Sequence, residues 1–493
     1  MRQADFSRKE MRKTKAMQKA RLAAAFSGLA MLSFFAAGCK VGPNYARPQV
    51  TAPPAFRGAD NADVSSGPNG SDPKGSLGDE QWAAVYREPE LQELIKKALA
   101  NNYDVRIAAQ RILEQQAQVK ITHSQEFPTV TFGGTAIGAD LPGSLASQLG
   151  GNPLVDGDWS LNVSWTPDFW GQYRRQTEAA RATLLAQKWA QKAVMMTLVE
   201  QVATDYIQLR AYDRQLEITK QTLKARQDSL DLTKTLESGG SSPLSDVRQA
   251  EQLLYTATSE IPQLEQQIQQ EENAITMLLG ENPGPIAHTD PNALAPPPQD
   301  LPTGLPSQLL ERRPDIQEAE AQLISANAQI GVARAQFFPS LPINASAGLG
   351  GNTWGGLVDT AGRTIYGYGS LTQPIFEGGR LKGQLQLAEE TKKELVINYQ
   401  KSIQTAFHDV SNALIALKKQ KENREEQEKL VAAAQDAVRL ARMRYQGGST
   451  SYLEVLTTDT NLFTAQLNLV TAQQNEALTI VQLYGALGGG WQS

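Results

Sequence analysis

The chain contains two tandem copies of one sequence unit. Three residue pairs of the first half recur 211 positions later: Asp104-Val105, Ala117-Gln118 and Phe127-Pro128 return as Asp315-Ile316, Ala328-Gln329 and Phe338-Pro339. Three later pairs recur at an offset of 208: Gln227-Asp228, Gly239-Gly240 and Leu279-Gly280 return as Gln435-Asp436, Gly447-Gly448 and Leu487-Gly488. The period is longer than that of a solenoid repeat, so the duplication predicts a single pseudo-symmetric fold built from two copies.

The amino-terminal residues 1–38 are typical of a bacterial export signal. Eight basic side chains precede an uncharged run, 22–38. The next residue is Cys39, the only cysteine of the chain. Small residues before a cysteine resemble the cleavage site of lipoprotein signal peptidase, so Cys39 is the predicted lipidation site. An uncleaved membrane anchor is the alternative, because the run approaches the length of a membrane span. Lys40, where Asp would favour inner-membrane retention, favours sorting to the outer membrane.

Charge and residue usage argue against nucleic-acid binding and against catalysis. Removing 1–38 takes the formal charge from -5 to -11, and an acidic surface repels phosphate backbones. His123, His288 and His408 are scattered, which is not the spacing of a metal site. The chain has no phosphate-binding loop and no dinucleotide fingerprint. We therefore expect neither an enzyme nor a cofactor, apart from a covalent lipid at Cys39.

Composition divides the rest of the chain into four parts. Residues 39–85 are rich in Pro, Gly, Asn, Ser and Asp, which predicts an extended, lipid-anchored segment on the outside of the main body. Repeat one covers 86–281, a proline-rich linker covers 282–306, and repeat two covers 307–493. Each repeat predicts the order helix, strand, strand, long helix, turn, helix.

The helices are unusually long. Repeat one opens with a helix predicted over 90–126, which ends at Phe127-Pro128 because proline removes a donor. Residues 172–237 and 380–445 contain no proline and keep a heptad-like apolar pattern, which predicts helices about 100 Å long and an extended coiled-coil tube or hairpin. Each reverses at a glycine pair into a shorter helix, 243–279 or 451–487, and Pro262 is expected to kink the first of these.

Each repeat also contains two strand patterns, predicted at 129–137, 159–166, 343–350 and 364–372. Trp159, Leu161, Val163 and Trp165 alternate with polar residues, and only the last strand is irregular, because Tyr366 and Tyr368 fall on its polar side. Such strands suit either a sheet half-buried on a helix or a transmembrane barrel with lipid on one side and water on the other. The aromatic residues at the strand ends and the predicted lipid anchor favour the barrel.

Several short sequence motifs resemble those of the TolC family of outer-membrane efflux proteins, in its lipoprotein (NodT-like) branch. They are 39–48, 164–171 with Arg174-Arg175, 312–316, 337–339 and 445–456. The resemblance implies a mixed α/β membrane protein that forms a homotrimer. Each subunit would give four strands to one outer-membrane β-barrel, continuous with a long periplasmic α-helical barrel. The implied function is passive conduction of drugs or other small molecules through a tripartite RND-type efflux system, from the periplasm to the exterior.

The same resemblance assigns roles to the helix reversals. The turns at Gly239, Gly240, Gly447 and Gly448 are expected to meet a periplasmic adaptor protein, whose partner is an inner-membrane pump. Asp246 and Glu454 occupy equivalent places and are candidate gate residues that would form an acidic ring. An ordinary acidic helix start is the alternative for Glu454.

The arginines before the second reversal are further candidates: Arg439, Arg442 and Arg444 would pair across the closed tip or serve as ordinary surface residues. The alternative function is a lipid-anchored periplasmic coiled-coil adaptor or scaffold. An adaptor should have one helical hairpin between β-rich domains, whereas this chain has two hairpins and two strand pairs. No residue pattern indicates the exported substrate.

Overall fold

The computed structural model describes residues 40–53, 55–58, 76–139, 142–144, 154–287, 306–351, 359 and 362–491. The predicted export signal, Cys39 and most of the predicted linker lie outside these ranges. The chain divides into two units. The strand unit takes its residues from 1–47, 114–184 and 321–396, and the hairpin unit takes its residues from 48–113, 185–320 and 397–493.

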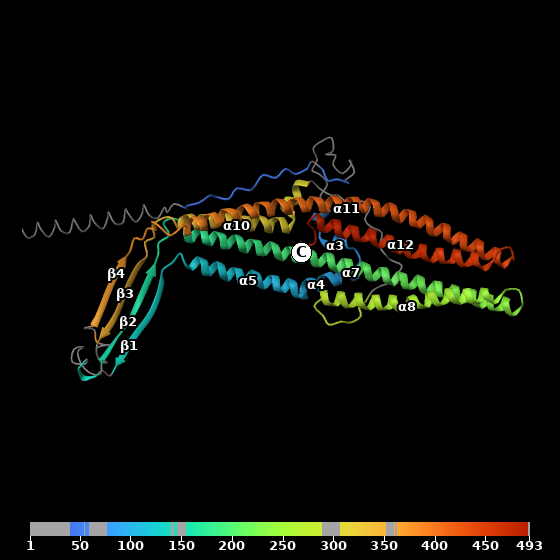
Figure 1. The fold of residues 1–493 in the computed structure, drawn as a ribbon, viewed down its shortest axis with the longest axis horizontal. Helices are drawn as coiled ribbons and strands as arrows, with labels where there is room; N and C mark the ends of the chain where they lie inside the picture. The colour runs from blue at the N-terminus through green and yellow to red at the C-terminus, as the bar shows by residue number, and fades with distance from the viewer. Residues whose placement is uncertain are drawn as a thin grey trace, which may run out of the picture. The chain divides into compact units, whose positions relative to one another are not determined.

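Each repeat contributes a helix, two strands, a long helix and a shorter helix (Figure 1). The helix lengths of the two repeats match residue for residue. Helices α5 (Tyr103–Ser124) and α10 (Pro314–Ala335) both have 22 residues. Helices α7 (Gln172–Ser238) and α11 (Arg380–Gln446) both have 67, and α8 (Leu244–Leu278) and α12 (Tyr452–Ala486) both have 35. The predicted element order within each repeat is confirmed. Pro262 lies inside α8, and the kink there stays a prediction.

The single helix expected over 90–126 is wrong, because the chain breaks at Asn102 between α4 (Pro89–Asn101) and α5. The backbone of Asn102 is not helical (φ -55°, ψ 133°), and its Oδ1 accepts from the amides of Asp104 (2.8 Å) and Val105 (3.2 Å). This side chain satisfies donors at the start of α5, so it acts as an N-cap that restarts the helix. The remaining short elements are η1 (Leu77–Asp79), α3 (Trp82–Val85), η2 (Pro306–Gln308) and α9 (Leu309–Arg312).

The strands form one antiparallel sheet in chain order. They are β1 (Thr129–Ala139), β2 (Leu154–Trp165), β3 (Ile343–Gly351) and β4 (Arg363–Gly369). The last strand is shorter than the predicted 364–372. Thr372 instead exchanges two backbone hydrogen bonds of 2.9 Å with Ser340 in an isolated bridge beyond the strand end.

The register separates the sheet into an apolar and a polar face, because directly paired residues point to the same side. One row joins Phe132, Leu161, Ala347 and Ile365, and the next row on that face joins Val130, Val163, Ala345 and Gly367. The intervening row joins Thr131, Asn162, Ser346 and Tyr366 on the opposite face. Tyr366 and Tyr368 therefore lie on the polar face, as the sequence pattern predicted, with their rings stacked 6.5 Å apart.

The hairpin unit has its own hydrophobic core, in which residues from both repeats meet. Ile95 of α4, Leu209 of α7, Ile275 of α8 and Leu483 of α12 are fully buried. The ring of Tyr484 packs edge-on against Tyr86 at 5.8 Å, and its hydroxyl donates to the carbonyl of Glu80 at 2.8 Å. Within the described ranges, no helix is both long enough and apolar enough to cross a bilayer.

Candidate functional site

The apolar face of the sheet is exposed on a single chain. The exposed fractions of Phe132 and Ile365 are 70% and 71%, and that of Leu161 is 48%. An apolar surface of this kind on a protein normally meets lipid or another protein. This row is apolar on all four strands, with large side chains on β1, β2 and β4 and Ala347 on β3, so it needs such a partner along its length.

The two outer strands add a second requirement. In the order β1-β2-β3-β4, strands β1 and β4 each have a described neighbour on one side only. The other edge of each carries backbone N–H and C=O groups that a second strand can pair. A bilayer offers no water to those groups, so a sheet that enters one must be closed.

The two helix reversals in the hairpin unit have the same geometry. Gly240 and Gly448 adopt positive φ angles of 68° and 70°, which glycine reaches without steric cost. In each turn the amide of the next residue bonds a carbonyl five residues back: Ser241 to Leu236 at 2.8 Å and Ser449 to Arg444 at 2.9 Å. This arrangement is a Schellman cap that ends one helix and turns the chain toward the next.

Asp246 and Glu454, the predicted gate residues, sit in equivalent positions beside these turns. Each carboxylate accepts a hydrogen bond from a hydroxyl four residues earlier: Asp246 from Ser242 at 2.8 Å, and Glu454 from Thr450. Asp246 also contacts the hydroxyl of Tyr445 from the other repeat at 3.5 Å. The two acids are therefore held next to the turns rather than free in solvent.

The three predicted arginines do not act together. Arg444 pairs with Glu454 at 2.7 Å, which brings one predicted cation and one predicted acid into contact. Arg442 instead reaches Asp459 at 3.2 Å, and Arg439 pairs with Asp436 one turn earlier on its own helix. These pairs form within one chain.

A buried ion pair near the reversals was missed by the sequence reasoning. Arg226 of α7 and Asp459 of α12 are 3% and 7% exposed, and Nε of Arg226 lies 2.9 Å from Oδ2 of Asp459. Arg226 also donates to the carbonyl of Leu253 on α8 at 2.9 Å, so one side chain joins three helices. The sequence does single out Asp459, because it is the only charged residue between Glu454 and Glu476.

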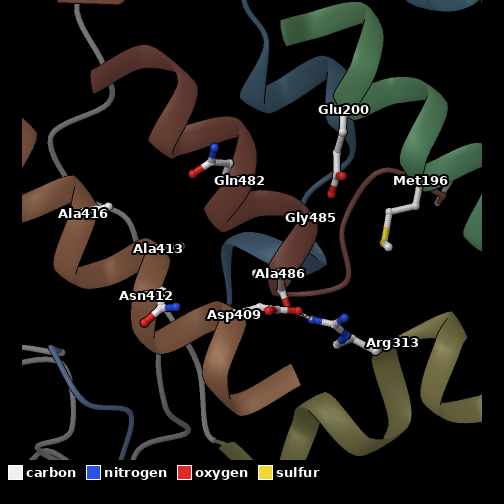
Figure 2. A pocket seen from close by; sticks show the side chains of 10 residues that line it. All are labelled: Met196, Glu200, Arg313, Asp409, Asn412, Ala413, Ala416, Gln482, Gly485 and Ala486. Atoms are coloured by element: carbon white, nitrogen blue, oxygen red, sulfur yellow. Dashed lines mark hydrogen bonds and ion pairs between the residues drawn. The ribbon is translucent and has the colours of Figure 1, made fainter. Parts of the chain in front are cut away.

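The hairpin unit also contains a polar cavity of about 400 Å³ (Figure 2). Its polar lining residues are Glu200 of α7, Arg313 before α10, Asp409 and Asn412 of α11, and Gln482 of α12. Arg313 is 6% exposed; it pairs with both carboxylate oxygens of Asp315, at 3.1 and 2.8 Å, and with Asp409 at 3.3 Å. Its remaining polar contact is the carbonyl of Ala486, 3.2 Å away.

Glu200 is the unusual group of this cavity. Burial raises its pKa to about 7; the charge of Arg313 opposes this rise and that of Asp409 adds to it. A Cβ atom on Gly485 would lie 1.2 Å from Oε1 of Glu200, so this position of the carboxyl group depends on glycine at 485. The group is thus placed where its charged form is costly at neutral pH.

The described histidines take part in ordinary polar contacts. His123 contacts Glu126 at 3.1 Å, and His408 contacts Asn412 at 2.9 Å. His288 lies outside the described ranges. In the part of the chain that the structure describes, no three His, Cys, Asp or Glu side chains gather as metal ligands would.

Comparison with known proteins identifies the family. The model of the family described as outer membrane efflux protein matches residues 94–281 and 305–489, so it matches both repeats. The toluene efflux pump outer membrane protein TtgC of Pseudomonas putida is 35% identical over 94% of this chain and 95% of its own length. The cation efflux system protein CusC of Escherichia coli is 33% identical over 92% and 96%.

A solved structure has the same fold. The open state of the MtrE outer membrane channel of Neisseria gonorrhoeae superposes with a TM-score of 0.78, at 27% identity, over 92% of this chain and 99% of that one. The chain therefore belongs to the outer membrane efflux protein family. It is an outer-membrane efflux channel component and a transport protein rather than an enzyme. Its fold is that of the family's trimeric channels, with a β-barrel and an α-helical barrel, as the resemblance implied.

Glu200→Gln should change the pH dependence of stability. The pKa of Glu200 is raised in the folded state from an ordinary value near 4.5 to about 7, so the folded chain binds this proton more tightly than the unfolded chain. Wild-type stability should therefore fall, relative to the variant, as pH rises through that window. Between pH 5 and pH 8, the free energy of unfolding of the variant should rise by about 2–3 kcal/mol relative to that of wild type.

The measurement is the unfolding midpoint of both purified proteins in detergent across this range. Because glutamine is neutral and nearly isosteric, every other titrating group cancels in the comparison. A difference between the two midpoints that does not change with pH would contradict the account of this cavity.

Proposed function

We propose that three copies of this chain form an outer-membrane duct, which passively conducts small molecules delivered by a periplasmic adaptor and an inner-membrane pump. The observation that carries the proposal is the four-stranded sheet, with apolar rows that cross one face and with two outer edges. Three such sheets joined edge to edge supply twelve strands, an even number suited to a closed membrane barrel. The apolar rows would then face lipid, and the polar rows would face the lumen.

The amino terminus is assigned to membrane anchoring. Cys39, preceded by an export signal, would carry covalent lipid and place the mature chain on the inner leaflet of the outer membrane. The body would extend from there into the periplasm. No other cofactor is needed, since the energy for transport would come from the pump.

The two helix reversals are assigned to the periplasmic tip. Gly239-Gly240 and Gly447-Gly448 end long helices in matching turns, a shape suited to packing against helical hairpins of an adaptor. Asp246 and Glu454 beside them would bring six carboxylates together in a trimer, and such a ring favours cations. The contacts to Ser242, Thr450 and Arg444 would hold this ring in place at rest.

The names of the relatives do not assign one cargo. TtgC is named for toluene efflux and CusC for cation efflux, at nearly equal identity to this chain. A passive duct selects little, so we assign the choice of substrate to the pump. The alternative of a periplasmic adaptor or scaffold gains no support from the sheet or from the family.

Leu161→Arg should prevent assembly in the outer membrane, whereas Asn162→Arg should not. The two residues are neighbours on β2 but lie on opposite faces, and Leu161 sits in the middle of the apolar row. An arginine on a lipid-facing position costs about 2–4 kcal/mol near the bilayer centre, whereas the lumen is wet. We expect a several-fold loss of trimer from the outer-membrane fraction for the first variant only.

The measurement is the amount of trimer in isolated outer membranes, by native mass. Equal amounts of trimer for the two variants would contradict the assignment of the faces. A monomeric mass for the wild-type protein would contradict the trimer itself.

Replacing both tip acids, Asp246→Ala with Glu454→Ala, should reduce cation selectivity. The physical reason is the loss of six negative charges from the narrow end of the trimer. The matched control removes two acids of the same hairpin unit that pair away from the turns, Glu251→Ala with Asp436→Ala. Reversal potentials in a KCl gradient should shift toward zero for the tip variant and stay unchanged for the control. An unchanged potential in the tip variant would remove the acidic ring.

A further inference from the structure

The segment that follows Cys39 is bound to the strand unit rather than loose. The amide of Val41 donates to the carbonyl of Trp170 at 3.1 Å, in the loop between β2 and α7. Nδ2 of Asn327, on α10, donates to the carbonyl of Pro43 at 2.9 Å. Two elements of the body thus hold the backbone of one short stretch, 40–44, which bends at Gly42 and has no regular secondary structure of its own.

The centre of this arrangement is the fully buried side chain of Arg175. It is 1% exposed, and all three of its guanidinium nitrogens are engaged. Nε donates to the carbonyl of Val41 (3.1 Å), and Nη2 donates to the carbonyl of Gly42 (3.1 Å) and to Oδ1 of Asn44 (3.0 Å). The third nitrogen, Nη1, pairs with Glu178 at 3.1 Å. A buried guanidinium is costly unless its donors are satisfied, and here the segment 40–44 satisfies most of them.

Two glycines make this approach possible. Gly42 has a φ of 99°, and a Cβ there would lie 2.5 Å from the Cα of Gly331 on α10. A Cβ on Gly331 would in turn lie 2.9 Å from Cγ, Cδ and Nε of Arg175. The segment, Gly331 and the stem of Arg175 are therefore stacked with no space for a methyl group between them.

A charge pair completes the contact at the first described residue. Nζ of Lys40 lies 2.5 Å from Oε2 of Glu178, the same carboxylate that pairs with Arg175. Burial alone would raise the pKa of Glu178, but the hydrogen bond from Lys40 and the charges of Arg175 and Lys40 lower it overall. Glu178 is therefore ionised at neutral pH and bridges both cations.

These features occur in only one of the two repeats. The position equivalent to Arg175 in repeat two, 208 residues later, is Gly383, and that equivalent to Glu178 is Gln386. The positions equivalent to Asn327 and Gly331 in repeat one, 211 residues earlier, are Gln116 and Lys120. The duplicated fold offers two places for such a site, and the side chains are present at one, which matches the single amino terminus of the chain.

We propose that Arg175, Glu178, Asn327 and Gly331 form a docking site for the chain's own segment 40–44, and that this site, rather than the acyl chain, fixes the amino terminus to the channel body. The site recognises a peptide with a cation at 40, glycine at 42 and an amide at 44. Since Lys40 is covalently linked to Cys39, docking would tie a lipid on that cysteine directly to the folded body. The lipid then anchors a rigid protein instead of a free tether.

The test uses the peptide bond between Lys40 and Val41 as a reporter. Trypsin cleaves after lysine only when the segment leaves its site, so the cleavage rate measures local opening. Mass spectrometry of the purified full-length protein follows the loss of the amino-terminal fragment. We expect slow cleavage in wild type, and cleavage about tenfold faster or more in Gly42→Ala and in Gly331→Ala, because each added methyl separates Arg175 from its acceptors.

Gly383→Ala is the matched control. It is also a glycine within a helix of the strand unit, but a Cβ there meets nothing within 4 Å. Its cleavage rate should equal that of wild type. Gly42→Ala alters only the segment, so the body should still fold, and native mass verifies this. Equal rates in all four proteins would overturn the docking site.

A second arm separates docking from lipidation. Replacing 1–39 by a secretory signal that leaves serine at position 39 gives a chain without acyl groups. Slow cleavage after Lys40 should persist in this chain. Cleavage as fast as in Gly42→Ala would show that the acyl chain holds the segment, and would overturn the proposal. Neither arm depends on conduction, so its failure is distinguishable from failure of the proposed function.

Discussion

The fold depends on one constraint: a sheet of four strands has two edges, and a bilayer tolerates none. β1 and β4 leave backbone groups on their outer sides, while the apolar row through Phe132, Leu161 and Ile365 spans the sheet between them. Water cannot satisfy these groups in a hydrocarbon layer, so other strands must. Assembly of several chains is therefore part of how the strand unit becomes stable.

The two repeats share one order of helices and strands, but some contacts between these elements are made by different side chains in each repeat. Asn102 in repeat one donates to the carbonyl of Leu278, and Arg313, its equivalent 211 residues later, donates to the carbonyl of Ala486, the equivalent of Leu278. The same contact between two elements is thus made by an amide in one copy and a guanidinium in the other. Arg313 pairs with Asp315, which repeat one also has as Asp104, and with Asp409, whose equivalent in repeat one is Gln201. Arg313 and Asp409 line the polar cavity near Glu200. The two repeats differ more at the docking site, because the position equivalent to Arg175 in repeat two is Gly383.

Much of this fold could be predicted from the sequence, because long repeated patterns leave little freedom. The helix ends of α7 and α11, set by glycine pairs, fell within one residue of expectation. The break at Asn102 was missed because the apolar period continues through it, and only the cap geometry reveals it. Arg226 and Asp459 were missed because their partnership joins positions 233 residues apart, which no local pattern encodes. The arginines near the tip were predicted as one group, but each pairs with a different acid, at separations of three to seventeen residues along the chain.

The most direct test of the central claim is single-channel recording on the purified protein in a planar bilayer, with the mass of the inserted species measured alongside. A trimeric channel should give discrete conductance steps from a particle with the mass of three chains. The steps should require neither nucleotide nor any added cofactor. A protein that remains a single chain and produces no steps would rule out a trimeric channel.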